Sequence, residues 1–567
     1  MKKTENIWWI DKLGDWNPQL LREIKGRLKT RNIAIAAIIS AIGQILFFLY
    51  YQGQLPSLLH WTKASSDRYC TGFGYPDSHQ LHYGRKCLVD SLGQVQIDWQ
   101  LWWLDLFVWS SIFGIFLLLV VGTYMLVADL SKEESRGTIE FIRMSPQSAK
   151  SILSGKILGV PILLYLVIAL GVPLNFASGL NAGIPIGLIL SFYGVLIAGC
   201  AFFYSAALLL GLVNFGLAGF KPWLGAVAVL VFLFVMTGIL MHDSLGYATD
   251  WLALFYPGTG LFYLVDAASL DSKVGYLEFK DLAVSLWYGK SLFSNSWSGI
   301  GFILFNLGLW TYWIWQGLLR RFHNPISTVL SKQQSYWISG SFIIITLGFT
   351  LQSDNRYGEF QSLILQQLSL LIVLLLLTAA IAPHRQTLLD WARYRHQVSP
   401  QQRRSLLKDL IWGEKSPSTL ALALCLLLTT GYTSLCLMLS PLAKTDKMTA
   451  FYGVIVSATI VLVYGAIAQL MLFMKTPKRA VWASTALGAL TILPLLCLAI
   501  FGINPNDKPW MFLLSMMPML GAEYAATQTI LLSLLGQWLA IALVGFQMTK
   551  QLQKAGESET KALFSAR

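Results

Sequence analysis

The sequence predicts an all-α protein that crosses a membrane many times. Apolar runs of about 20 residues recur along the chain, which is the length that a helix needs to cross roughly 30 Å of hydrocarbon. Only 13% of the 567 residues are charged, whereas soluble domains carry roughly 25%. Because backbone polar groups must pair within the chain when they lie in lipid, these runs are expected to form helices. This composition excludes a soluble enzyme with one large core.

We expect about twelve transmembrane helices. Their approximate bounds, taken from the apolar runs, are 33–51, 104–128, 157–177, 184–213, 223–241, 297–317, 337–351, 361–383, 418–440, 449–474, 481–503 and 523–547. The seventh run is the shortest and the fourth the longest, so these two depart most from the length of a single crossing.

Basic residues are distributed unequally between the two sides of the membrane. With the N-terminus in the cytosol, 31 of the 42 Lys and Arg residues fall in cytosolic segments and 11 in outer ones. Cytosolic loops of polytopic proteins carry such an excess. We therefore predict a multi-pass protein of the cell membrane, inner or plasma, with both termini in the cytosol. The net charge of +13 lies in these loops, so no nucleic-acid partner is expected.

One outer segment is a polar loop at 52–100. It contains Cys70 and Cys87, the only two of the six cysteines outside the expected spans. In an oxidising outer compartment, we expect these two cysteines to form a disulfide. His79 and His82 lie between them, but the spacing matches no zinc module, so no metal site is predicted.

The other long outer segment, 242–296, contains an apolar stretch at 251–264 that Pro257 and nearby glycines interrupt. The stretch is too short and too broken to span a bilayer, which indicates a re-entrant or interfacial hairpin. A similar stretch follows Trp510 and is interrupted at Pro518. We therefore expect a re-entrant outer hairpin before the last span of each half.

The second half of the chain repeats the plan of the first. The nine residues SPQSAKSIL at 145–153 and SPQQRRSLL at 399–407 are identical at five positions. Asn-Pro pairs also precede the first and the seventh spans. We predict two tandem six-helix units, 1–320 and 321–550, followed by a cytosolic tail, 551–567, that is expected to be disordered. An even number of spans in each unit makes the repeat parallel.

A charged segment, 129–156, separates the second and third spans on the cytosolic side. Ser131 and Glu134 have the spacing of a capping box, which predicts a helix that begins there. Gly137 is expected to let another backbone approach closely. The Ser-Pro step at 145–146 is expected to end this helix and to begin the next. These signals alone leave open whether the segment docks onto a partner or is a solvated loop.

A further helix is predicted at 17–28, before the first span. Asn17 is a good N-cap, and Pro18 suits the first helical position. Four aliphatic side chains share one face and the basic side chains point elsewhere, which suits a helix in the inner headgroup layer. A simple anchor for the first span and a mechanical role fit this pattern equally well.

The runs ESRGTIEFIRMSPQS at 134–148 and ILSGKILG at 152–159 resemble the signature of ABC-2 type exporter permeases, the transmembrane subunits of ATP-binding cassette (ABC) exporters. Six spans per unit and a hairpin before the last span are similar to that family as well. The resemblance implies that cytosolic coupling helices in this segment dock onto a separate ATPase subunit and transmit its closure to the spans. The coupling residues that it implies are Glu133, Glu134, Arg136, Gly137, Thr138, Glu140, Arg143, Ser145 and Pro146.

The second unit departs from this pattern in its counterpart segment, 385–412. The residues that correspond to Glu133, Glu134, Gly137 and Glu140 are Thr387, Leu388, Trp391 and Tyr394. If both segments dock, we expect them to dock differently, either on two different ATPases or unequally on two copies of one. The coupling residues expected here are Ser399, Pro400, Arg403 and Arg404.

The chain lacks a Walker A loop, which needs Gly-x4-Gly-Lys-Ser/Thr to hold phosphate. Gly289-Lys290-Ser291 has no glycine five positions earlier, and Gly155-Lys156 is followed by Ile157. We therefore predict no catalytic residues and no cofactor in this chain, with ATP and Mg²⁺ held by ABC ATPase partner subunits. Membrane lipid is the other expected partner.

Two other functions remain open. A membrane-embedded enzyme or assembly factor would use the outer segments 52–100 and 242–296 on lipid-linked substrates, but their polar residues show no recognised catalytic spacing. A secondary transporter normally carries carboxylates or histidines near the middle of the membrane. Here, Asp105 and Glu523 lie near the outer ends of spans instead.

Overall fold

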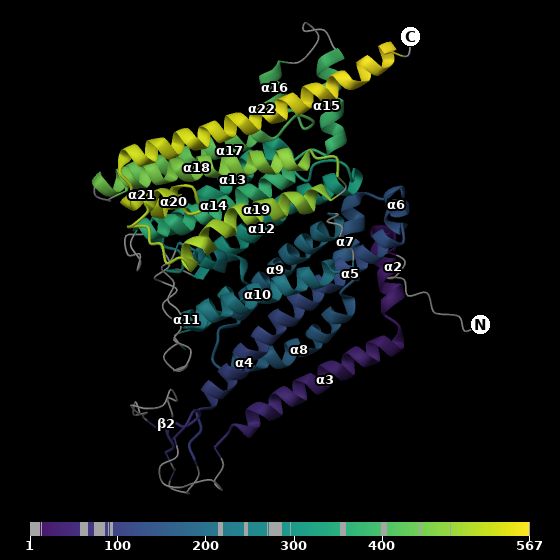
Figure 1. Ribbon diagram of the computed structural model, residues 1–567. Helices are drawn as coiled ribbons and strands as arrows, with labels where there is room; N and C mark the ends of the chain where they lie inside the picture. Colours follow the sequence, from purple (N-terminus) through teal and green to yellow (C-terminus); the bar gives the residue numbers. More distant parts are fainter. Residues whose placement is uncertain are drawn as a thin grey trace, which may run out of the picture. The chain divides into compact units, whose positions relative to one another are not determined.

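The computed structural model describes most of the chain, and most of the described part is helical (Figure 1). The described residues are 12, 14–56, 66–72, 85–88, 90, 95–213, 219–242, 248–268, 270, 286–294, 296–351, 359–397, 405–440, 444–476 and 478–565.

The chain divides into two compact units. Unit 1 comprises Met1–Leu245, Leu252–Ser285 and Ser291–Phe322. Unit 2 comprises His323–Arg567 together with two short earlier segments, Gly246–Trp251 and Leu286–Lys290.

Unit 1 contains α-helices joined by short connections and one small sheet. The helices are α2 (Pro18–Arg27), α3 (Thr30–Gly53), α4 (Trp99–Phe116), the π-helix η2 (Leu117–Val121), α5 (Gly122–Ser135), α6 (Thr138–Arg143), α7 (Ala149–Gly159), α8 (Ile162–Asn181), α9 (Ile186–Leu212), α10 (Lys221–His242), α11 (Gly258–Ala267) and α12 (Ser296–His323). The sheet pairs β1 (Ser66–Asp67) with β2 (Arg85–Lys86) in antiparallel fashion. A 3-10 helix, η3 (Asp250–Phe255), begins among the residues assigned to unit 2.

Unit 2 is also built of α-helices. Its helices are α13 (Lys332–Thr350), α14 (Glu359–Ile381), α15 (Arg385–Gln397), α16 (Leu406–Trp412), α17 (Thr419–Leu439), α18 (Lys444–Leu472), α19 (Arg479–Ile500), α20 (Pro509–Leu513), α21 (Pro518–Tyr524) and α22 (Thr527–Ser565). A second two-stranded sheet pairs β3 (Leu286–Trp287) with β4 (Lys290–Ser291).

Ten helices in the described part of the chain are long and apolar enough to cross a membrane. The chain is therefore an all-α, multi-pass membrane protein. Each of the ten coincides with one of the twelve predicted spans. The other two predicted spans, 297–317 and 337–351, form helices α12 and α13, but these helices fall outside the ten. Trp, Tyr, Asn and Gln side chains in α12 and Ser, Thr and Gln in α13 lower the hydropathy of both.

Three helix pairs recur at matching places in the two units, whereas others differ, since α10 packs mainly on α5 and α19 on α18. In unit 1, α3 packs on α8, and α9 packs on both α5 and α11. In unit 2, α13 packs on α17, and α18 packs on both α14 and α21. This pairing follows the order of elements along the chain and agrees with the arrangement of each unit in Figure 1.

The apolar core at one end of unit 1 joins α5, α6 and α7 to α9 and α12. Its buried members include Leu126, Leu130, Ile139, Ile142, Ile152, Leu153, Leu208, Leu318 and Phe322. Side chains that lie in one such cluster are held in contact by the burial of their apolar surface. The segment between the second and third spans is therefore part of the fold and is not a solvated loop.

The helix of the second span continues well past its predicted end. It runs from Trp99 to Ser135 through η2, so Ser131 lies inside α5 and caps nothing. The prediction that a new helix begins at Ser131 was wrong. A helix that is already formed adds residues at little cost, and this outweighs a local capping signal.

The chain end is also more ordered than predicted. Helix α22 continues to Ser565, so the expectation of a disordered tail at 551–567 was wrong for the described residues. Gln, Lys, Glu and Ala dominate this stretch and favour a helix, and they extend one that is already nucleated.

Each stretch that was expected to form a hairpin contains two short helices. In the first, Pro257 separates η3 from α11, and the residues of α11 from Gly258 to Val265 are all buried. In the second, α20 and α21 each begin with a proline. Proline suits the first turn of a helix but cannot lie within one without loss of a hydrogen bond, which explains why neither stretch is continuous.

The described part of the 52–100 loop is fixed to the start of α4. Cys70 and Cys87 form a disulfide bond. Arg68 makes two hydrogen bonds of 2.7 Å to the buried carboxylate of Asp105, and the Tyr69 hydroxyl donates to the same carboxylate at 3.0 Å. A buried carboxylate needs such partners, so this loop and the N-terminal end of α4 are positioned together.

Gly122, at the junction of η2 and α5, provides a test of packing inside unit 1. A Cβ atom at this position would overlap the ring of Tyr204, whose hydroxyl donates to the Leu118 carbonyl of η2 at 2.8 Å. We expect Gly122→Ala to destabilise the protein by about 1–3 kcal/mol, as overpacking of cores does. Thermal unfolding of the purified chain in detergent measures this.

The control is Gly114→Ala in the same continuous helix, where no described atom lies within 4 Å of the added methyl group. It should leave the unfolding midpoint unchanged or raise it slightly, since Ala is the better helix former. Equal midpoints for the two variants would contradict the packing described for Tyr204.

Candidate functional site

Helix α6 is short, amphipathic and exposed on one side. Ile139 and Ile142 point into the core of unit 1 and are 6% and 7% exposed. Phe141 and Met144 point away from it and are 76% and 78% exposed. Six residues are too few to form a stable helix alone, so burial of the two isoleucines holds α6 in place while the other face stays free.

Gly137 links α5 to α6 through its backbone conformation. Its φ is 69°, in the left-handed region, and it occupies the N-cap position of α6. No described atom lies within 4 Å of the place where its Cβ would be. Within the described residues, no other part of the chain makes the expected close approach to this glycine. The turn itself requires a residue that tolerates positive φ.

Helix α2 packs directly on α7. The Asn17 side chain accepts from the Leu20 amide at 3.0 Å, which confirms its predicted role as N-cap, and donates to the Ser151 carbonyl at 2.8 Å. Gly155 and Gly159 leave room for α2, because a Cβ on Gly155 would lie 2.8 Å from Asn17 Oδ1. Helix α2 is thus part of the site and is more than an anchor for the first span.

A buried lysine on α7 joins three helices. Lys156 is 1% exposed, and its Nζ lies 2.7 Å from Asp129 Oδ2 and 2.8 Å from Glu133 Oε2, both on α5. Glu23 Oε1 of α2 lies 3.9 Å from the same nitrogen. An ammonium group can be buried only where charges of opposite sign surround it, so Lys156 fixes α2, α5 and α7 relative to one another.

Two arginines of α2 complete this cluster, which we call the Lys156 cluster. Arg27 contacts Asp129 at 2.8 Å and Glu23 at 3.2 Å, and Arg22 contacts Glu133 at 2.9 Å. The three carboxylates are therefore matched by three cations: Lys156, Arg22 and Arg27.

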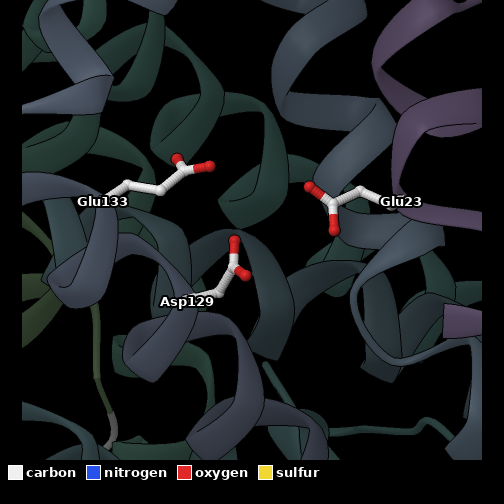
Figure 2. A group of neighbouring side chains, drawn as sticks. All are labelled: Glu23, Asp129 and Glu133. Carbon is white, nitrogen blue, oxygen red and sulfur yellow. The ribbon is translucent and has the colours of Figure 1, made fainter. Parts of the chain in front are cut away.

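The three carboxylates of Glu23, Asp129 and Glu133 converge on one space (Figure 2), and their oxygens lie within 4.8 Å of one another, as in a metal site. The Lys156 ammonium is within reach of all three carboxylates. Because the charges of the cluster already balance, these carboxylates act as partners of the lysine and need no metal ion.

The neighbouring glutamate, Glu134, makes a separate connection. Its Oε2 lies 3.1 Å from Nζ of Lys221, which is 1% exposed at the start of α10. Consecutive residues at the end of α5 thus hold two different helices, α7 through Glu133 and α10 through Glu134.

The other predicted residues of this segment surround α6. Arg136 ends α5 and is exposed, and the Thr138 hydroxyl donates to the Glu133 carbonyl at 3.2 Å. Glu140 pairs with Arg143 at 3.6 Å, so the two side chains share a face of α6. Helix α6 ends at Arg143, and Ser148 caps α7, so the break falls around the Ser145–Pro146 step as expected.

Sequence reasoning missed the core of the site. Glu23, Asp129, Lys156 and Lys221 were not predicted as site residues. Lys156 carries the only local signal, since it is a lone cation between apolar residues at the start of a predicted span. Such a residue is expensive in an apolar environment and implies a nearby anion.

In unit 2, the corresponding segment is held by different contacts. Arg395 of α15 lies 2.9 Å from Asp409 of α16. Lys332, the first residue of α13, is 2% exposed and donates to the Leu410 carbonyl at 2.7 Å, the Ser416 hydroxyl at 2.7 Å and the Pro417 carbonyl at 2.9 Å. The four residues predicted here, Ser399, Pro400, Arg403 and Arg404, lie outside the described residues.

Comparison of the chain with protein-family models, with curated proteins and with solved structures finds no match. The arguments for function therefore depend on the site itself.

Replacing Lys156 tests the Lys156 cluster. In Lys156→Met, Asp129 and Glu133 lose their buried partner, and we expect a loss of about 3–5 kcal/mol, as when one member of a buried ion pair is removed. Lys150→Met, on the same helix but exposed, should change stability by less than about 0.5 kcal/mol. Thermal unfolding in detergent measures both. A Lys156→Met protein as stable as the Lys150→Met control would show that the cluster does not hold the helices.

Lys332 gives unit 2 a specific dependence on pH. Burial lowers the pKa of Lys332 from 10.5 to about 8, because its hydrogen-bond acceptors are neutral. Between pH 8 and 10.5 the unfolded chain therefore binds more protons at this residue than the folded chain, so stability from Lys332 rises with pH. The unfolding midpoint of wild type, relative to that of Lys332→Met, should therefore be higher at pH 9.5 than at pH 7.5. A constant difference would contradict this.

Proposed function

We propose that the chain is the permease subunit of an ABC exporter, which forms the translocation path and couples to separate ATPase subunits. One observation carries the proposal: α6 presents Phe141 and Met144 on a short helix that is not part of any membrane-length helix. Large apolar side chains exposed outside the membrane mark interaction sites.

The support beneath α6 suits a surface that must transmit force. Ile139 and Ile142 lie in one apolar core with residues of α5, α7, α9 and α12, and the Lys156 cluster ties α2 to the same helices. A load applied to Phe141 would thus reach α5, which is continuous with the second span. A solvated loop needs no such bracing.

The expected orientation places α6 in the cytosol. The Cys70–Cys87 disulfide is typical of an oxidising compartment, outside the cytosol. Helix α3 is a membrane-length helix between that loop and α2, so α2 and the helices packed on it belong on the opposite, cytosolic side. The excess of Lys and Arg in the same segments favours this orientation as well.

The proposed architecture is a duplicated one, with twelve spans in two six-helix units. Helices α12 and α13 would complete the ten membrane-length helices, and the matching helix pairs in the two units support the duplication. Helices α15 and α16 would be the second docking segment. The partner subunits would bind ATP and Mg²⁺. Their ATP-driven dimerisation would push on both docking segments. Lipids, glycans, peptides and amphipathic small molecules are the substrate classes that such exporters handle.

The decisive experiment purifies the tagged chain from its own membranes and measures ATP hydrolysis and the co-purifying subunits. Wild type should retain an ATPase. Phe141→Ala should weaken its retention by about 30-fold, the effect of about 2 kcal/mol, as for a central aromatic contact in an interface. Both proteins should unfold at the same temperature, because Phe141 is exposed.

Phe113→Ala is the matched control, since Phe113 is 63% exposed but lies within a membrane-length helix. It should leave the retained ATPase unchanged. A stable chain without ATPase but with hydrolytic or transferase activity would support a membrane enzyme instead. Transport that survives ATP depletion but is abolished by an ionophore would support a secondary transporter.

A further inference from the structure

The C-terminal helix α22 is much longer than a membrane crossing needs. Its 39 residues, Thr527–Ser565, extend about 58 Å at 1.5 Å per residue, whereas hydrocarbon is roughly 30 Å thick. Its membrane-length part ends at Lys554. The end of the helix therefore continues beyond the apolar part into a polar region.

The last turn of the membrane-length part of α22, just before Lys554, covers the apolar face of α15. Leu388 and Leu389 of α15 form a buried cluster with Phe473, and Leu552 of α22 packs against it. Figure 1 shows α22 and α15 side by side, in agreement with the extensive contact between them. The three buried side chains are 5%, 8% and 6% exposed.

Helix α15 is also fixed at its start. Arg385 donates to the Phe473 carbonyl at 3.1 Å, and its guanidinium lies 5.8 Å from the centre of the Phe473 ring. Phe473 follows the last residue of α18. The start of α15 is thus held by the end of α18, and Leu552 closes the cluster from the other side.

The contacts continue from α15 to α16 and α13. Asp409 of α16 accepts from Arg395 at 2.9 Å and from the Trp391 indole at 3.4 Å. The end of α16 is held by Lys332, through the Leu410 carbonyl, and by the Tyr336 hydroxyl, which donates to the Ile411 carbonyl at 2.8 Å. A shift of α15 would therefore displace α16.

In unit 1, the corresponding segment, α6 and α7, is braced by α2, which lies toward the opposite end of the chain. There, α2 packs on α7 and supplies Glu23, Arg22 and Arg27 to the Lys156 cluster. In unit 2, residues 324–331, which correspond in place to α2 and are all described, form turns and bends without a helix. The position of α15 and α16 must be secured in another way.

We propose that the C-terminal part of α22, around Leu552, is a brace that positions α15 and α16, as α2 braces α7 in unit 1, with Leu552 as the positioning residue. If the proposed function holds, this brace keeps the second docking segment in place for its ATPase. The two docking segments of the chain are then secured by its two ends.

The test replaces Leu552 by Gln in the full chain and follows amide hydrogen exchange in the membrane-embedded protein. Peptides covering 385–397 and 406–412 should exchange about tenfold faster, since a local contact that limits opening is lost. Peptides covering α6 should be unchanged. The control is Gln553→Ala at the adjacent exposed position, which should leave all peptides unchanged. Unchanged exchange in α15 of Leu552→Gln would overturn the proposal.

A second readout separates the brace from the proposed function. Retained ATPase activity should fall in Leu552→Gln and return in Leu552→Met, which restores an apolar side chain. Faster exchange in a chain that never retains an ATPase would support the brace and reject the permease. Unchanged exchange in a chain that does retain an ATPase would reject the brace alone.

Discussion

The burial of one ammonium group constrains the end of unit 1. Lys156 has almost no exposed surface, and its charge is tolerated only because carboxylates from α2 and α5 surround it. If any of the three helices moves away, a charge is left uncompensated in an apolar environment, at a cost of several kcal/mol. The six residues of α6 are held through Ile139 and Ile142, which lie in an apolar core shared with α5 and α7. Their position depends on the neighbours that Lys156 holds together.

Unit 2 reaches a similar result with different chemistry. Its buried lysine, Lys332, is bound by two carbonyls and a hydroxyl, while its carboxylate, Asp409, is paired with Arg395. Neutral acceptors stabilise an ammonium less than carboxylates do, which is why burial dominates the pKa of Lys332. The two units thus share three matching helix pairs and differ in the electrostatics of their corresponding segments.

Features with a local cause could be predicted from the sequence. Length and hydropathy define ten of the spans, and the N-cap at Asn17 depends on residues within one turn. The Lys156 cluster could not be predicted, because Arg22 and Glu133 are 111 residues apart and only the fold brings them together. At Ser131 the local signal was misleading, since the incoming helix simply continued. The proposed coupling role of this segment rests on resemblance and exposure, not on a local rule.

The π-helix between α4 and α5 determines the direction in which the later side chains of the second span point around the helix axis. Each residue added to a helix rotates the later part of that helix by about 100°. A wider π turn accommodates an extra residue while the helix stays continuous. Tyr204 satisfies the Leu118 carbonyl there. The bulge therefore sets the direction in which Asp129 and Glu133 point. Loss of a single residue within Leu117–Val121 would rotate both carboxylates away from Lys156 while leaving every member of the cluster in the sequence.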